Sequence, residues 1–127
     1  MQITDGQFNS SSLTQFGKEV IDLFKCRDFN TLAVRFGYAL AYDREPYEAI
    51  KEDLNYCFIR ADGRSPITED IGPEIEVKFF SKNTIGLEAV IECLIEMIEG
   101  LWIEVDLVVI KNGQIRNLSI EDITYLA

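Results

Sequence analysis

Between Leu87 and Val109 the chain places an apolar residue at almost every second position, and this alternation constrains the fold more than any other feature of the sequence. Alternation over four to eight residues is typical of a β-strand with one buried face. In residues 87–98, however, glutamates also recur every three or four residues, which is the spacing of one helix face. Periodicity alone therefore leaves this segment as a strand or a helix.

The residues that follow favour the strand. A three-residue loop, Ile98-Glu99-Gly100, would join residues 87–98 to a second strand over 101–110 and would place Gly100 where a left-handed backbone is needed. The apolar residues of both strands then point to one face of the sheet. The predicted cross-strand pairs are Ile95 with Ile103, Cys93 with Val105, and Ile91 with Leu107.

A second hairpin is predicted at Asn112-Gly113, the dipeptide favoured in two-residue type I′ turns. It extends the apolar face to a third strand. The predicted pairs are Leu107 with Leu118 and Val105 with Ile120. Alternation of apolar and charged residues over 74–79 adds a half-buried strand before these three. We therefore expect an antiparallel meander over residues 74–126.

Residues 12–58 carry helical periodicity instead. Ser12 and Gln15 form a capping box at the start of the first expected helix, Asp28 is an expected N-cap for the second, and Glu45-Pro46 is typical of the start of a third. Residues 1–11 form an N-terminal arm and Arg60–Pro73 a long loop. We expect one α+β domain over residues 1–127, with the helices packed on a curved antiparallel sheet.

The sheet face opposite the apolar one collects acidic residues. On the predicted register it carries Glu88, Glu92, Glu96, Glu104, Asp106 and Glu121. Glu92 would lie opposite Asp106, and Glu104 opposite Glu121, although like charges directly across a ladder are unfavourable. Three interpretations remain open: a solvated face that blocks edge-to-edge aggregation, a docking surface for a basic partner, and a divalent-cation site, which the absence of an EF-hand-like loop disfavours.

The charge balance excludes several classes of partner. Twelve Lys and Arg against 22 Asp and Glu give a net charge of −10, which repels nucleic-acid phosphates and anionic membrane surfaces and favours a basic protein. The absence of His excludes histidine-based triads and metal sites. Three widely spaced cysteines indicate neither a disulfide framework nor a metal site, and fit a cytoplasmic setting. We expect no cofactor and no metal.

Four segments carry a resemblance to a known fold. Residues 25–29 (KCRDF) join the first two helices, DFNTLAVRF stands in the place of that fold's second helix, and EPYEAIKEDL in the place of its third. The ending VDLVVIKNGQIRNLSIEDI is similar to its last hairpin. The chain thus resembles the nuclear-transport-factor-2-like superfamily, a cone-shaped α+β fold shared with ketosteroid isomerases and scytalone dehydratase. The first hairpin of that fold would have to fit into Tyr38–Pro46.

The resemblance implies two functions. Small acidic immunity proteins, some of them built on this fold, neutralise cationic nuclease-type bacterial toxins. Enzymes of the superfamily act inside the cone on small apolar ligands, and ketosteroid isomerases imply Asp43 as proton acceptor with Tyr42 or Tyr38 as hydroxyl donor.

We expect the first function: a non-catalytic inhibitor of a basic toxin domain, with the enzyme as the alternative and self-association into a homodimer as a third option. An exposed Trp among carboxylates is suited to an Arg-rich partner. The expected partner-binding residues are Glu88, Glu92, Glu96, Trp102, Glu104, Asp106 and Glu121.

Overall fold

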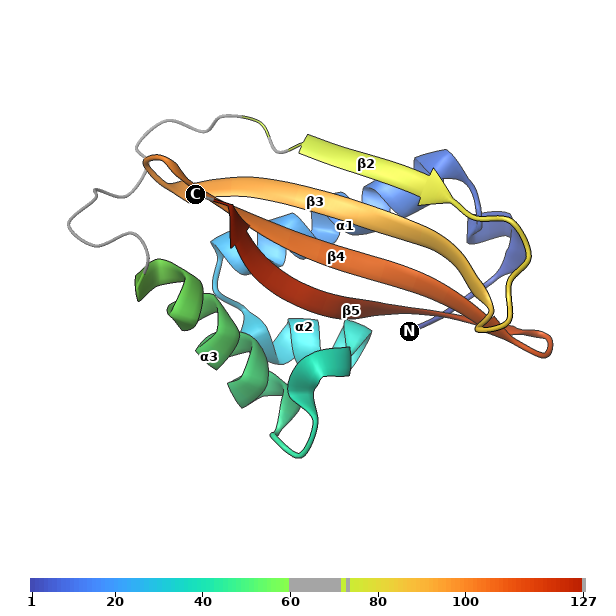
Figure 1. The fold of residues 1–127 in the computed structure, drawn as a ribbon, viewed down its shortest axis with the longest axis horizontal. Coiled ribbons are helices and arrows are strands. Elements are labelled where there is room, and N and C mark those ends of the chain that lie inside the picture. The colour runs from blue at the N-terminus through green and yellow to red at the C-terminus, as the bar shows by residue number, and fades with distance from the viewer. Residues whose placement is uncertain (60–71, 73, 127) are drawn as a thin grey trace.

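In the computed structural model the chain forms helices packed against one face of a curled, five-stranded antiparallel sheet (Figure 1). The structure describes residues 1–59, 72 and 74–126. The strand order is β1-β5-β4-β3-β2. The strands are β1 (Gln2–Ile3), β2 (Glu74–Phe79), β3 (Leu87–Ile98), β4 (Leu101–Asn112) and β5 (Ile115–Leu126). The predicted α+β class is confirmed, and residues 87–98 are a strand.

The helices begin close to their expected positions. They are α1 (Ser10–Lys25), α2 (Phe29–Phe36) and α3 (Pro46–Ile59), with short 3-10 turns at Asp5–Gln7 and Ala39–Ala41. Asp28 caps α2 as predicted, since its Oδ1 accepts from the Thr31 N–H at 3.2 Å. The capping box predicted at Ser12 is wrong: the N-cap of α1 is Asn9, three residues earlier, and its side chain accepts from the Ser12 N–H at 2.8 Å.

The β3–β4 pairs are the predicted ones. Ile95 lies opposite Ile103, Cys93 opposite Val105, and Ile91 opposite Leu107. The connection differs from the predicted three-residue loop, because β3 continues to Ile98 and only Glu99-Gly100 form the turn, with Gly100 at φ 75°. A β-bulge at Met97 absorbs the extra residue and keeps both apolar sets on one face.

The predicted β4–β5 register is wrong. The two residues between the strands are Gly113 and Gln114, so the pairing moves by two residues from the one that an Asn112-Gly113 turn would give. A bulge at Glu121 shifts it once more. The observed pairs are Val109 with Leu118, Leu107 with Ile120, and Val105 with Ile123. The shift of two leaves the apolar residues on the same face, because side chains alternate with a period of two.

The N-terminal arm is part of the sheet. Gln2 and Ile3 pair with Asn117 and Arg116 of β5, and the Met1 ammonium donates to the Leu118 carbonyl at 2.8 Å. Most of the loop expected over Arg60–Pro73 lies outside the described residues. No described helix has the length and apolar character needed to cross a membrane.

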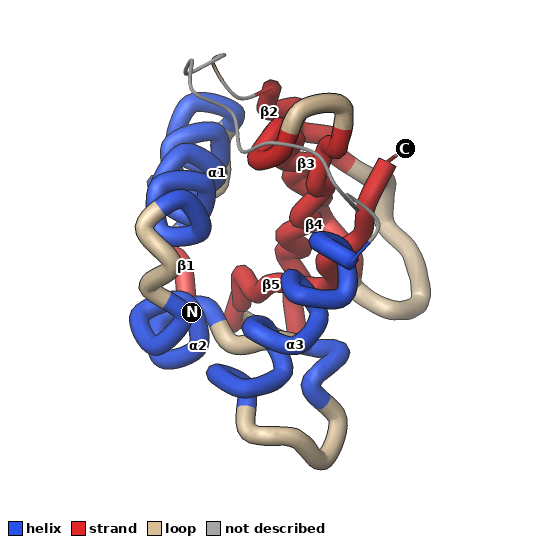
Figure 2. The backbone as a smooth tube through the Cα atoms, turned by 90° about the vertical axis from the view of Figure 1, so that its left-hand side faces the viewer, coloured by secondary structure: helices blue, strands red, loops and turns tan. Residues whose placement is uncertain are grey.

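The core lies between the helices and the face of the sheet that we call the inward face. Figure 2 shows α1 running along this side of the curled sheet. Ile91, Ile103 and Leu107 are fully buried there. Gly17 lets α1 approach closely: a Cβ at this position would stand 3.1 Å from Ile75 Cγ2 and 3.2 Å from Cys93 Sγ. The opposite, outward face bears the acidic side chains.

A bulky residue at position 17 is expected to force α1 away from the sheet. We predict that Gly17→Leu lowers the free energy of unfolding by about 1–3 kcal/mol, as overpacking of a filled core does, measured by urea denaturation. The matched control is Gln15→Leu, which places the same side chain at an exposed position of α1 and should change stability by less than about 0.5 kcal/mol. Equal effects from both variants would contradict the close approach.

Candidate functional site

Four carboxylates lie directly opposite one another on four successive strands of the outward face. Glu76 of β2 pairs with Glu92 of β3, Glu92 pairs with Asp106 of β4, and Asp106 pairs with Asp122 of β5. We call this set the acidic row. Like charges directly across a ladder destabilise a sheet, so the row holds four such groups against their mutual repulsion.

Glu104 adds a fifth carboxylate next to the row. Carboxylate oxygens of Glu92, Glu104 and Asp106 lie within 4.8 Å of one another. The Lys78 ammonium of β2 forms an ion pair with Glu92 Oε1. Oδ1 of Asp106 and Oδ1 of Asp122 are inaccessible to solvent and accept no hydrogen bond within the described part of the chain. The acidic row and Glu104 together form what we call the acidic face.

Asp106, at the centre of the acidic face, binds its proton more tightly than an ordinary carboxyl does. Partial burial of Asp106, together with the charges of Glu104 and Asp122, raises the pKa of its carboxyl to about 8. Ionising Asp106 adds a charge where two neighbours already repel it. A cation placed against this carboxyl would favour the ionised form and displace the proton.

Glu92, Glu104 and Asp106 are also the described residues that could hold a cation. Carboxylate oxygens are the ligands that divalent ions such as calcium prefer. In the structure the Lys78 ammonium already supplies a positive charge to Glu92.

Four of the seven predicted partner-binding residues lie apart from this centre. Glu88 accepts from Arg116 Nε at 2.7 Å, and Glu96 accepts from the Gly100 N–H at 3.2 Å. Trp102 pairs with Glu96 at the far end of β3 and β4. Glu121 occupies the β5 bulge, so the predicted Glu104–Glu121 pair is wrong and Glu104 lies opposite Thr124. Glu92, Glu104 and Asp106 are the three that the fold brings together.

Sequence reasoning missed Glu76 and Asp122. Glu76 belongs to a strand that the alternation did predict, but the length of the connection to residue 87 left its partner strand and register open. Asp122 was missed because the bulge at Glu121 turns it, and not Glu121, toward Asp106. Nothing in the local composition distinguishes these two neighbouring acids.

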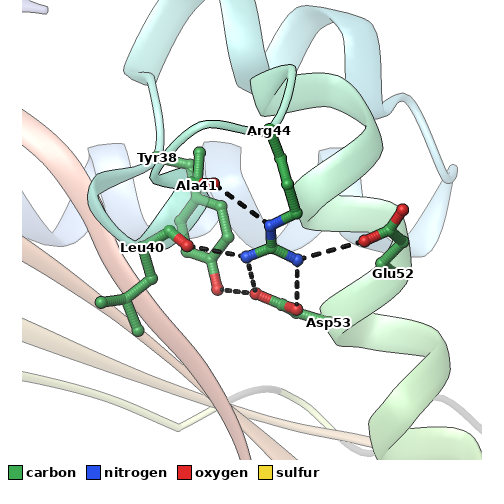
Figure 3. A network of polar contacts seen from close by, with 6 residues as sticks. All are labelled: Tyr38, Leu40, Ala41, Arg44, Glu52 and Asp53. Atoms are coloured by element: carbon green, nitrogen blue, oxygen red, sulfur yellow. Dashed lines mark hydrogen bonds and ion pairs between the residues drawn. The ribbon is translucent and has the colours of Figure 1, made fainter.

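A second polar cluster joins α3 to the segment after α2 (Figure 3). The Tyr38 hydroxyl donates to Asp53 Oδ2 at 2.5 Å, and the Arg44 guanidinium donates to both Asp53 oxygens at 2.9 and 3.2 Å. Arg44 also donates to Glu52 and to the carbonyls of Leu40 and Ala41. Each guanidinium nitrogen therefore has an acceptor, and the cluster fastens the turn at residues 38–44 to α3.

The pKa shifts in this cluster are those of a structural ion pair. Burial raises the pKa of Tyr38, and its hydrogen bond to Asp53 raises it further. Burial also raises the pKa of Asp53, but the hydrogen bonds from Arg44 and Tyr38 outweigh it, so the pKa lies below its usual range. Asp53 is therefore held ionised by its neighbours, and a carboxylate of lowered pKa is a poor proton acceptor.

The three residues of the enzyme alternative are not brought together. Tyr38 is buried and hydrogen-bonded to Asp53, whereas Tyr42 is 81% exposed. Asp43 follows Tyr42 on the same turn and is exposed. The inward face that would line a catalytic cone is occupied by core side chains, Ile91, Ile103 and Leu107 among them.

Cys57 and Cys93 are buried, and burial raises the pKa of Cys57 to about 11 and of Cys93 to about 12, so neither is a ready nucleophile. Cys26 is exposed at the end of α1. A surface hollow of about 840 Å³ lies between residues 80–88 and the β4–β5 turn and includes no member of the acidic face.

Comparison of the chain with protein-family models, with curated protein sequences and with solved structures finds no match. Its function is therefore inferred from the acidic face itself.

The raised pKa of Asp106 predicts a pH-dependent stability. Because the folded-state value of about 8 lies above the ordinary 3.8, this group stabilises the fold fully below about pH 4, and the stabilisation is lost as the pH rises through about 8. Asp106→Asn should raise the thermal midpoint more at about pH 8 than at about pH 5. Glu99→Gln, at an exposed turn, is the control and should show no such difference; a parallel pH profile for D106N would contradict the assignment.

The Tyr38 hydroxyl is predicted to stabilise the fold. Tyr38→Phe removes a hydrogen bond to a charged acceptor and should lower the free energy of unfolding by about 1.5 kcal/mol, near the lower end for such bonds, since Asp53 keeps Arg44. Urea denaturation measures the change. Tyr42→Phe removes the same hydroxyl from an exposed side chain and should leave stability unchanged within about 0.5 kcal/mol.

Proposed function

We propose that the protein is a non-catalytic binding protein that covers the cationic surface of a basic partner protein with its acidic face. The observation that carries this proposal is the acidic row, in which Glu76, Glu92, Asp106 and Asp122 face one another on adjacent strands. The row alternates along the strands with the buried residues of the inward face and therefore lies on the opposite side of the sheet, whereas α1 packs on the inward side (Figure 2).

The energetics of the row favour a cationic partner. In the isolated chain the neighbouring carboxylates disfavour the charge of Asp106, and its pKa of about 8 leaves it largely protonated at neutral pH. Among the four carboxylates of the row, Glu92 has an ion-pair partner in the described residues, Lys78. Arg or Lys side chains of a partner would replace repulsion with attraction at the remaining carboxylates.

The nature of the partner follows from its charge. Nucleases and other proteins that bind phosphate backbones present clustered Lys and Arg, and an acidic face of this kind competes with the nucleic acid for them. The fold, helices packed on a curled antiparallel sheet, is compatible with the resemblance to cone-shaped immunity proteins. We therefore propose inhibition of a nuclease-type bacterial toxin as the specific function, with Trp102 as an apolar contact at the end of the acidic face.

The test is binding to the purified product of the neighbouring gene, measured by calorimetry over a range of salt concentrations. We expect affinity to fall as salt rises, because the attraction is between charges. The double variant Glu104→Gln/Asp106→Asn should bind about tenfold more weakly, or about 1.4 kcal/mol. If the partner cleaves nucleic acid, the protein should inhibit cleavage in proportion to binding.

The matched control removes two charges elsewhere. Glu45→Gln/Glu48→Gln alters exposed positions at the start of α3 and should leave affinity within about twofold of the wild type. Absence of binding, binding that is independent of salt, or equal losses from the two double variants would each contradict the acidic face as the contact surface.

A further inference from the structure

We propose that β2 is a homodimerisation edge, at which two copies of the chain pair their β2 strands antiparallel about a two-fold axis through Val77. The two five-stranded sheets would then form one continuous sheet. This inference does not rest on the proposed function: it concerns main-chain pairing at the edge of the sheet, and Glu76 is the one member of the acidic face that takes part in it.

The first observation concerns the outer edge of β2. It is the last strand of the sheet and, among the described residues, pairs with β3 alone. The Phe80 N–H donates to the Glu88 carbonyl at 3.0 Å, in line with the β2–β3 register. Because hydrogen-bonded residues alternate along an antiparallel strand, the main-chain groups of Ile75, Val77 and Phe79 point away from β3. Such a row of donors and acceptors is a template for another strand.

The second observation is that the sequence of this edge is complementary to itself. Two copies of β2 can pair antiparallel through the main-chain groups that point away from β3 in two registers that have two-fold symmetry and include five of the six β2 residues. One is centred on Glu76 and places it opposite Glu76 of the second copy, which is repulsive. The other is centred on Val77 and places Glu76 opposite Lys78 of the second copy, once on each side of the axis. These pairs are not hydrogen-bonded pairs, so their side chains approach most closely.

The same register also covers apolar surface. Phe79 would lie opposite Ile75 of the second copy, and Phe80 opposite Glu74. In the single chain Phe79 is 50% and Phe80 45% exposed. The three hydrogen-bonded positions would supply about six main-chain hydrogen bonds. Charge, apolar contact and main-chain pairing therefore agree on one register.

The fold leaves room for the second copy. A Cβ at position 17 would stand within 3.3 Å of side chains of both β2 and β3, so this turn of α1 lies beneath the two strands. With adjacent strands about 4.8 Å apart, the two α1 helices would come to about 10 Å from each other, which is an ordinary helix-packing distance. A lone Lys on an edge strand can also serve to block pairing; here the self-complementary register turns it into a contact.

Charge reversal tests the register directly. Analytical ultracentrifugation of the wild type should show a monomer–dimer equilibrium with a dissociation constant below about 1 mM. Lys78→Glu alone places Glu opposite Glu, and Glu76→Lys alone places Lys opposite Lys, so each variant should dimerise at least tenfold more weakly than the wild type. Mixing the two variants restores opposite charges at both positions, and a heterodimer should form.

Two further variants guard against trivial explanations. Val77→Pro removes the main-chain N–H that points away from β3 at the two-fold axis, and it removes no hydrogen bond to β3. The variant should therefore be monomeric, and its circular dichroism spectrum should show that it is folded. Lys51→Glu makes the same charge change as K78E at an exposed position of α3 and should dimerise like the wild type. A monomeric wild type, a dimeric V77P, or failure of the mixture to form a heterodimer would each overturn the proposal.

Discussion

The ladder between β3 and β4 is the constraint on which the rest of the structure depends. Each strand places apolar side chains on the inward face, where Ile91, Ile103 and Leu107 are fully buried. Since successive side chains point to opposite faces, burying these residues forces Glu92, Glu104 and Asp106 outward together. Their repulsion is therefore a consequence of the hydrophobic pattern and is held in place by the core.

Much of the fold follows from patterns in the sequence, whereas the registers follow only in part. Alternation and Gly100 predicted the β3–β4 pairs correctly, but not the bulge at Met97 that preserves them. The β5 register was mispredicted because Gly113-Gln114, and not Asn112-Gly113, forms the turn. A shift of two residues leaves the buried face unchanged, so hydrophobicity alone could not detect it.

The candidate site was predictable only where it depends on β3 and β4. Glu92 and Asp106 were placed opposite each other from the alternation, and the structure has the same pair. The position of Asp122 opposite Asp106 depends on the bulge at Glu121. Glu88 instead accepts a hydrogen bond from Arg116, which lies 28 residues later in the chain. The Tyr38–Asp53–Arg44 cluster was not predicted either. Tyr38 and Arg44 lie on the turn before α3 and Asp53 lies within α3, and only the tertiary structure defines how this turn packs against the helix.

Lys78 links the acidic face to the edge of the sheet. Within the chain its ammonium pairs with Glu92, while in the proposed dimer it also lies next to Glu76 of a second copy. One cation between two carboxylates neutralises both only in part, so the dimer would keep most of the negative field of each copy. Moreover, the two acidic faces would lie on the same side of one sheet. A basic partner with its own two-fold symmetry could then contact both faces at once, and the second contact would form at high effective concentration.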